Sequence, residues 1–154
     1  MTSVEDITCV LKKSGMRLTP QRMAICKFLS ETAVHPTAAM IHKEVRNQYP
    51  SLSLMTVYNT LNRLVYLGLV NSLGTAGDNN IHYDGNISDH VNLACISCHK
   101  IEDIDINDIK NIENEVSVVS GYKILGFRMM YYGLCPDCQK TKLLSSDNQL
   151  PLNI

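Results

Sequence analysis

The sequence predicts an α+β fold in two parts: a helical part that ends in a β-hairpin, and a smaller α/β part held together by cysteines. Apolar residues recur at helical spacing through the first part of the chain. Two short β-type runs around a Gly- and Asn-rich turn follow within residues 69–84. Beyond them, two Cys-x-x-Cys pairs, Cys95/Cys98 and Cys135/Cys138, flank a second set of strand and helix patterns.

The first two helices are predicted from their ends. Residues typical of a capping box begin a short helix at Ser3, and Gly15 supplies its stop. Thr19-Pro20 places an N-cap before a proline at the first helical position, and this second helix ends near Ser30.

A third helix is predicted from Thr37 to about Gln48, and a fourth from Ser53 to Gly68. The apolar stripe of the fourth helix consists of Leu54, Val57, Leu61, Leu64 and Val65. Its opposite face carries hydrogen-bonding groups in place of the usual lysines and glutamates: Thr56, Tyr58, Asn59, Thr60, Asn62 and Arg63. Such a face is suited to contacting donors and acceptors on another molecule.

Leu69–Ser72 and Ile81–Asp84 are predicted to form the hairpin strands. Helices followed by a two-stranded wing predict a winged helix-turn-helix, whose last helix enters the DNA major groove. Residues 1–78 carry eight basic and five acidic side chains, net +3, and the remainder carries six against ten, net −4. A basic N-terminal half agrees with a polyanionic partner, although the same architecture also serves protein-interaction modules.

The second part contains strands predicted at Val91–Ala94 and Ile101–Ile104 and a long β run from Tyr122 to Leu134. Between them, a helix ending at Gly121 has an apolar stripe of Ile109, Ile112, Val116 and Val119. We therefore expect a winged-helix DNA-binding domain at 1–84, a hinge at about 84–88, a dimerisation domain at 89–144 and a frayed tail at 145–154.

The two Cys-x-x-Cys pairs predict one structural zinc site. Two disulfides and a redox-active pair are the alternatives, but a reducing cytosol disfavours the first and the second needs only one pair. A four-thiolate zinc site has no open coordination position, so we expect it to stabilise the fold and not to catalyse. The remaining cysteines, Cys9 and Cys26, are expected to be buried or half-buried.

A second group of metal-binding residue types gathers around the hinge. It comprises His82, Asp84, Asp89 and His90, with Asp103 further on and His35 before the third helix. Nitrogen and carboxylate donors without thiolate suit Fe²⁺ or Mn²⁺, and Zn²⁺ less exclusively. Taken singly, each of these residues is more often a surface or capping group. A shared ion would fix the orientation of the two domains and act as a switch.

Several motifs together resemble the ferric uptake regulator family of bacterial repressors over about residues 5–142. They are Arg17-Leu18-Thr19-Pro20-Gln21-Arg22, His35-Pro36-Thr37-Ala38, Thr56-Val57-Tyr58-Asn59-Thr60-Leu61, Gly68-Leu69-Val70 and the two cysteine pairs. The resemblance implies a homodimer that binds a double-stranded DNA operator, a structural zinc on Cys95, Cys98, Cys135 and Cys138, and a regulatory metal that enables DNA binding.

The resemblance also implies site residues. The regulatory Fe²⁺ or Mn²⁺ would be held by His35, Asp84, His90 and Asp103, and the two aspartates are similar to the peroxide-sensing branch of the family. In that branch, iron-catalysed oxidation of a ligating histidine, here His35 or His90, releases the metal and the DNA. The implied DNA contacts are Arg17, Arg22, Thr56, Tyr58, Asn59 and Arg63.

One position departs from the family pattern. Asn92, the fifth candidate ligand of the regulatory metal, stands where the family has a second histidine, three residues before the first cysteine pair. The site could then be weaker, favour Mn²⁺, recruit His82 or His99, or be absent.

The function classes that remain are few. The sequence shows no catalytic pairing or phosphate-binding glycine loop typical of an enzyme, and no apolar run or basic leader that predicts a membrane or secreted protein, so we expect a cytoplasmic regulator. The alternatives to a peroxide sensor are an iron, manganese or zinc uptake regulator without oxidation sensing, a thiol-based redox sensor, and a zinc-stabilised adaptor.

Overall fold

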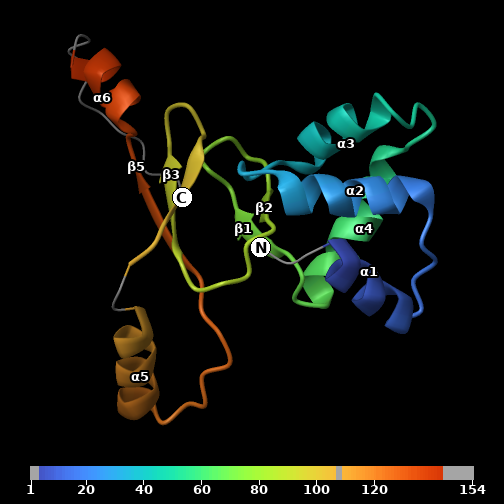
Figure 1. Ribbon diagram of the computed structural model, residues 1–154. Helices are drawn as coiled ribbons and strands as arrows, with labels where there is room; N and C mark the ends of the chain where they lie inside the picture. Colours follow the sequence, from blue (N-terminus) through green and yellow to red (C-terminus); the bar gives the residue numbers. More distant parts are fainter. Residues whose placement is uncertain (1–3, 107–108, 144–154) are drawn as a thin grey trace. The chain divides into compact units, whose positions relative to one another are not determined.

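The computed structural model describes residues 4–106 and 109–143, and the chain divides into two compact units (Figure 1). Of the described residues, the first unit takes in 4–75 and 79–88. The second unit takes in 76–78, 89–106 and 109–143. Within the described ranges, no helix has the length and apolar character needed to cross a membrane.

Four helices build the first unit: α1 (Val4–Lys13), α2 (Pro20–Glu31), α3 (Ala38–Arg46) and α4 (Leu54–Tyr66). Three of them begin at the predicted N-caps, where a hydroxyl accepts a hydrogen bond from the backbone N–H three residues on. Thr19 caps α2, Thr37 caps α3 and Ser53 caps α4. Gly15 and Gly68 follow α1 and α4 with φ angles of +77° and +68°, which are left-handed values that favour glycine.

A continuous apolar core lies between these helices. Val57, Leu61 and Leu64 of α4 are fully buried, as the predicted stripe requires. They belong to one cluster with Leu11 of α1, Ile25 and Leu29 of α2, and Ile41 of α3. α4 therefore packs one face inward and presents the other to solvent.

Three residues of the first unit differ from the sequence-based expectation. Leu54 is exposed because it is the first residue of α4, beyond the core. Thr60 is fully buried, and its hydroxyl donates to the carbonyl of Thr56 at 2.7 Å, so it belongs to the core and not to the polar surface. Cys9 is exposed, because α1 turns Ile7 and Leu11 inward and Cys9 lies between them on the opposite side.

Cys26 is buried, as predicted. Burial raises the pKa of its thiol to about 11, so this cysteine remains a neutral thiol of the core at ordinary pH.

The wing is an antiparallel pair of β1 (Asn71–Gly74) and β2 (His82–Asp84), with an irregularity between Ser72 and Gly74. The segment before α3 lies along β2. Thr37 bridges to His82, and the backbone N–H of Tyr83 donates to the carbonyl of Pro36 at 3.0 Å. Residues that are far apart in the sequence are thereby joined within the first unit.

The second unit is a three-stranded sheet with two helices. Its strands are β3 (Val91–Cys95), β4 (Ile101–Ile104) and β5 (Met129–Gly133), in the order β4-β3-β5, and its helices are α5 (Ile109–Ser120) and α6 (Pro136–Leu143). β3 pairs antiparallel with β4 and parallel with β5. The helices and small sheets of the two units confirm the predicted α+β class.

Two expectations for the second unit are wrong. The β run predicted from Tyr122 to Leu134 is paired only as β5, because no strand among the described residues lies beside 122–128 to complete a ladder. The helix α6 was not predicted, although Pro136 at its start and Asp137 in its first turn are typical helix-start residues. The predicted frayed tail, 145–154, lies outside the described residues.

Candidate metal centres and nucleic-acid interface

Four cysteine thiols converge at one end of the second unit. Cys95 ends β3, Cys98 lies in the following turn, and Cys135 and Cys138 lie at the start of α6. Their sulfur atoms all lie within 4.8 Å of one another. The backbone N–H of Cys135 also donates to the sulfur of Cys95 at 3.3 Å, which links the two pairs.

The sulfur positions fit a tetrahedral metal and not disulfides. The Sγ atoms of Cys98 and Cys135 are 3.8 Å apart. A tetrahedron with Zn–S bonds of about 2.3 Å has sulfur–sulfur edges of roughly 3.8 Å, whereas a disulfide bond measures about 2.0 Å. The four thiols therefore match the donor set and the dimensions of a closed Zn²⁺ site.

The surroundings of Cys95 and Cys138 shift the pKa values of their thiols in opposite directions. Burial by itself raises the pKa of Cys95, but hydrogen bonds from the backbone N–H groups of Cys135, Cys98 and Ser97 outweigh it and lower the pKa to about 6. Hydrogen bonding with the Cys135 thiol raises the pKa of Cys138 to about 12. Four neighbouring thiols cannot all ionise without a cation, and Zn²⁺ supplies the charge that they need.

The first unit contains a buried histidine–carboxylate pair. His35 precedes α3, Asp84 ends β2, and His35 Nε2 lies 3.8 Å from Asp84 Oδ1. The pairing of the segment before α3 with β2 brings these residues together. Asp84 Oδ1 also accepts the backbone N–H of Asn86 at 2.6 Å. Because a buried carboxylate is costly unless a positive charge compensates it, this pair is suited to a cation.

The second unit contains a histidine–carboxylate pair of its own. His90 is buried just before β3, and its Nε2 lies 3.5 Å from Oδ1 of the exposed Asp103 on β4. Asn92 of β3 is also buried, and its Nδ2 lies 3.1 Å from the same His90 nitrogen. Asn92 is therefore a third polar side chain next to the His90/Asp103 pair.

The other histidines and the remaining acid considered for this site have different surroundings. His82 Nδ1 lies 2.7 Å from the carbonyl oxygen of His35 and helps to hold that residue in place. His99 Nδ1 lies 2.9 Å from the carbonyl of Ala76, so the turn after Cys98 holds residues 76–78 of the wing loop. Asp89 is exposed.

The predicted DNA contacts fall into three groups. Arg17, Tyr58 and Asn59 are exposed and available to a partner. Thr56 contributes its hydroxyl to the N-terminal end of α4, 2.9 Å from Ser53 Oγ. Arg22 and Arg63 are half-buried: Arg22 donates to the carbonyl of Arg17 at 2.6 Å, and Arg63 donates to the carbonyl of Ser14 at 2.7 Å. The last two arginines therefore hold the segment between α1 and α2.

The sequence interpretation did not single out two exposed residues of α4. Met55 and Tyr66 are 65% and 79% exposed. With Asn59 and Asn62 they recur at the i, i+4, i+7, i+11 spacing that defines one helix face, which is the signal that could have found them.

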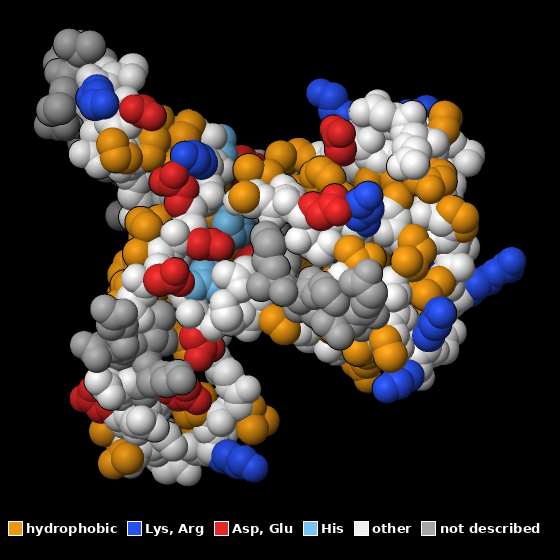
Figure 2. All heavy atoms as spheres, in the orientation of Figure 1, with side chains coloured by type: hydrophobic (Ala, Val, Ile, Leu, Met, Phe, Trp, Pro, Cys, Tyr) orange, Lys and Arg blue, Asp and Glu red, His pale blue; other side chains and the backbone are white. Residues whose placement is uncertain are grey.

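Charge is distributed unequally over the surface. On the face drawn in Figure 2, Lys and Arg side chains project from the helices of the first unit, whereas Asp and Glu side chains are frequent over the strands and α5 of the second. A unit with basic side chains on its surface and a helix that exposes hydrogen-bonding groups has features typical of a nucleic-acid-binding module.

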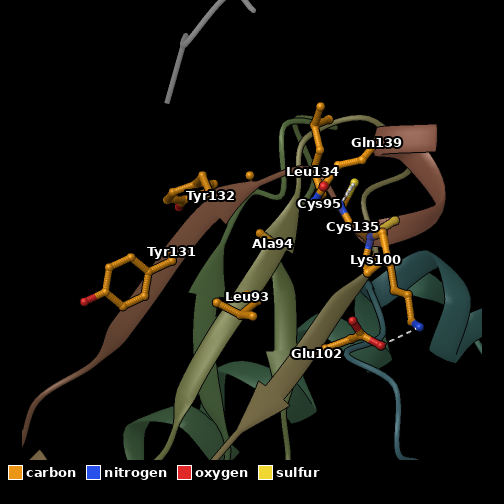
Figure 3. A pocket seen from close by; sticks show the side chains of 12 residues that line it. Leu93, Ala94, Cys95, Lys100, Glu102, Tyr131, Tyr132, Leu134, Cys135 and Gln139 are labelled. Atoms are coloured by element: carbon orange, nitrogen blue, oxygen red, sulfur yellow. Dashed lines mark hydrogen bonds and ion pairs between the residues drawn. The ribbon is translucent and has the colours of Figure 1, made fainter. Parts of the chain in front are cut away.

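The sheet of the second unit has two different faces. Leu93, Glu102 and Tyr131 share a row of the strand register and line a groove of about 280 Å³ next to Cys95 and Cys135 (Figure 3). Because successive strand residues point to opposite faces, Asn92 and Asp103 lie on the other face. The groove is thus separate from the histidine–carboxylate pair.

A helical unit with a two-stranded wing, joined to a unit with a four-cysteine metal site, defines the class of metal-containing winged-helix proteins. The comparison with protein families is more specific. The chain belongs to the ferric uptake regulator family, whose sequence model matches residues 13–132.

Relatives of known name support this assignment. A peroxide operon regulator of Bacillus subtilis strain 168 is 38% identical over 130 residues, which cover 84% of this chain and 89% of the relative. A peroxide-responsive repressor PerR of Staphylococcus saprophyticus is 35% identical over 136 residues, covering 88% and 91%.

Solved structures agree. The ferric uptake regulator of Helicobacter pylori has a TM-score of 0.76 at 24% identity, covering 90% of this chain and 95% of that one, and this likeness shows the fold. The peroxide-sensing PerR of Streptococcus pyogenes is 34% identical, with a TM-score of 0.52 and the same coverage.

Proposed function

We propose that this protein is a metal-dependent, peroxide-responsive transcriptional repressor that binds operator DNA as a homodimer. The observation that carries the proposal is the presence of one histidine–carboxylate pair in each unit, His35/Asp84 and His90/Asp103. Two relatives of the chain, at 38% and 35% identity, are named as peroxide regulators, which supports peroxide as the signal that this protein senses.

One divalent cation bound by both pairs would act as the switch. Two imidazole nitrogens and two carboxylate oxygens form a donor set that suits Fe²⁺ or Mn²⁺. Because one pair comes from each unit, the ion would bind well only in one arrangement of the units. Metal would thereby favour the conformation that binds DNA.

Peroxide sensing would use the histidines of this site. The net reaction would transfer one oxygen atom of H₂O₂ to an imidazole ligand and release the other as water. Bound Fe²⁺ would supply the electron that cleaves the O–O bond, and the oxidised imidazole would return it. His35 and His90 are the oxidisable ligands of the set, and an imidazole that has gained oxygen is a poorer ligand. Loss of His35 or His90 from the donor set would release the metal, and the units would no longer be held for DNA binding.

DNA recognition is assigned to α4 and its surroundings. Tyr58 and Asn59 are exposed on α4 and can contact base edges, and Arg17 can contact a phosphate. The structural zinc site would hold the second unit, which would form the dimer.

Operator duplexes selected from random DNA with the Mn²⁺-loaded protein provide the test. Fluorescence anisotropy should show DNA binding only with Mn²⁺ or Fe²⁺ added. Brief H₂O₂ treatment should abolish binding by the Fe²⁺ form, and peptide mass spectrometry should find the mass of one added oxygen atom on the His35 or His90 peptide. The Mn²⁺ form is the control and should keep its DNA affinity under the same treatment.

Other outcomes assign other functions. Metal-dependent DNA binding without histidine oxidation would indicate a metal-uptake regulator. Oxidation confined to cysteine with zinc release would indicate a thiol-based sensor. DNA binding that ignores added metal would indicate an adaptor without a metal switch.

A further inference from the structure

Asn92 lies in the donor-bearing row of the second unit's sheet. In the strand register it is directly opposite Asp103 on β4 and Met130 on β5. Directly paired residues project from the same face of a sheet, so the side chains of Asn92 and Asp103 are neighbours. His90, one residue before β3, is the remaining polar member of this group.

The contacts of Asn92 are unusual for a buried amide. Only 4% of the residue is exposed. Its Nδ2 faces His90 Nε2 at 3.1 Å, whereas its Oδ1 is buried and makes no hydrogen bond to any residue in ranges 4–106 and 109–143. A buried amide oxygen normally has a donor, so this oxygen is left for a group that the polypeptide does not provide.

His90 Nε2 is the common point of the group. It lies 3.1 Å from Asn92 Nδ2 and 3.5 Å from Asp103 Oδ1. A cation bound by that nitrogen would be next to the Asp103 carboxylate and the Asn92 amide together. The amide N–H could not remain directed at a nitrogen whose lone pair is given to a metal. A half-turn about the Cβ–Cγ bond exchanges the two ends of the amide within nearly the same volume.

We propose that Asn92 is itself a ligand of the regulatory metal, through Oδ1, and that it biases the site toward Mn²⁺ and against Zn²⁺. The inference rests on the proposed function, because it concerns the same metal. Without metal, the amide N–H is directed at the coordinating nitrogen of His90. With metal, the amide turns and Oδ1 joins His90 and Asp103 as the third donor from this sheet.

The specificity follows from donor chemistry. An amide oxygen is a hard donor of the kind that Mn²⁺ accepts, whereas imidazole favours Zn²⁺ and the later transition metals. Metal binding must also displace the Asn92–His90 contact, which lowers the affinity for every ion alike. An amide oxygen in place of an imidazole therefore changes the ratio of the Mn²⁺ and Zn²⁺ affinities. The loss of the Asn92–His90 contact on metal binding lowers both affinities.

Three substitutions at Asn92 separate these effects. Asn92→Leu keeps approximately the volume and removes both polar atoms, Asn92→Asp keeps an oxygen donor, and Asn92→His supplies an imidazole. The full-length dimer carrying only its structural zinc is titrated with Mn²⁺, and free Mn²⁺ is followed by its EPR signal. Competition with Zn²⁺ then gives the ratio of affinities. Zinc content and thermal unfolding before the titration show that each variant is folded.

The expected results distinguish a metal ligand from a residue that only supports the fold. Asn92→Leu weakens Mn²⁺ binding by about tenfold or more, and Asn92→Asp retains it. Asn92→His raises the affinity for Zn²⁺ relative to Mn²⁺ by about tenfold. Pulsed EPR of the Mn²⁺-bound protein finds one more coordinated imidazole in Asn92→His than in the wild type. Leu93→Ala, on the opposite face of β3, is the control and leaves Mn²⁺ affinity unchanged.

Two failures can be told apart. If the wild type binds Mn²⁺ and loses it in His35→Ala, but Asn92→Leu binds as tightly as the wild type, Asn92 is no ligand and only this inference is overturned. An Asn92→Asp variant that is as weak as Asn92→Leu overturns it as well. If the wild type takes up no Mn²⁺ beside its zinc, the proposed function fails together with the inference.

Discussion

At the residue scale, the two classes of cysteine allow a matched test of the zinc site. Cys95→Ser removes one of four thiolates and leaves three that cannot close the tetrahedron. Structural zinc contributes apparent folding free energies of about 10–16 kcal/mol in zinc-finger peptides. We therefore expect the variant to lose its zinc and the fold of the second unit. Zinc content by mass spectrometry and circular dichroism measure both effects, and Cys9→Ser, at an exposed cysteine, should change neither.

Arg63 and Arg17 test whether a half-buried and an exposed arginine have different roles. Arg63 donates to the carbonyl of Ser14 at 2.7 Å and to its hydroxyl at 3.3 Å, beyond the end of α1, and its guanidinium lies 5.2 Å from the ring centre of Tyr66. Arg63→Ala should lower the free energy of unfolding by about 1–3 kcal/mol, because hydrogen bonds from a charged donor are lost. Urea unfolding measures this change.

Arg17→Ala should have the opposite profile, because the side chain is exposed and free to contact a phosphate. Its free energy of unfolding should stay near the wild-type value. Its DNA affinity should fall for all sequences, and the salt dependence of binding should lose about one unit of slope. If Arg63→Ala and Arg17→Ala lower the free energy of unfolding equally, the two arginines do not differ in their structural role.

At the element scale, Gly85, the residue after the wing, lies close to the backbone of α2. A Cβ added at Gly85 would lie 2.5 Å from the carbonyl oxygen of Leu29 in α2, a contact that backbone atoms cannot relieve without moving. Gly85→Ala should therefore destabilise the first unit by about 1–3 kcal/mol. Gly133→Ala in β5 is the control, because its Cβ would meet no atom within 4 Å. Urea unfolding measures the free energy of unfolding of both variants, and an equal value for Gly85→Ala and the wild type would contradict the prediction.

Local signals explain which elements could be predicted from the sequence. Thr19, Thr37 and Ser53 start their helices through a hydrogen bond three residues away, and Gly68 ends α4 through its own φ angle. Such features depend on a few neighbouring residues. The four-cysteine cluster was predictable for a similar reason, because the spacing within each pair already restricts the ligand geometry.

The unpredicted features depend on contacts between distant segments. Residues 122–134 contain several β-type side chains, such as Tyr122, Ile124 and Phe127, yet within the described ranges only Met129–Gly133 pairs with another strand. Thr60 has a polar side chain, but the packing of α4 buries it, and a hydroxyl satisfied by the carbonyl of Thr56 makes that possible. The contact between His99 and Ala76 joins a turn to the wing loop across 23 positions. No local pattern in the sequence encodes such pairings.

At the scale of the whole molecule, the second unit has much apolar surface that the described residues do not cover. Val118 and Val119 of α5 and Leu125 after it are each more than 80% exposed. A groove of about 240 Å³, lined by Ile112, Val116 and Phe127 among others, lies alongside. Exposed apolar surface on this scale marks an interaction site, and the family's dimeric regulators point to a second copy of the chain as the partner.

Val119→Glu tests whether this surface forms the dimer. In the dimer, each copy would bring one carboxylate into the interface, where the carboxylates would lose their hydration and repel each other. The variant should therefore be largely monomeric by sedimentation velocity. Its zinc content should remain at the wild-type value, because Val119 is 82% exposed and contributes little to the fold of the unit. Binding to a two-fold symmetric operator should weaken, because each monomer would engage its half-site alone. Val34→Glu, at an exposed valine of the first unit, supplies the same charge change and should remain dimeric. If both variants sediment as dimers, the apolar surface around α5 serves some other contact, and the two copies must associate through a different face.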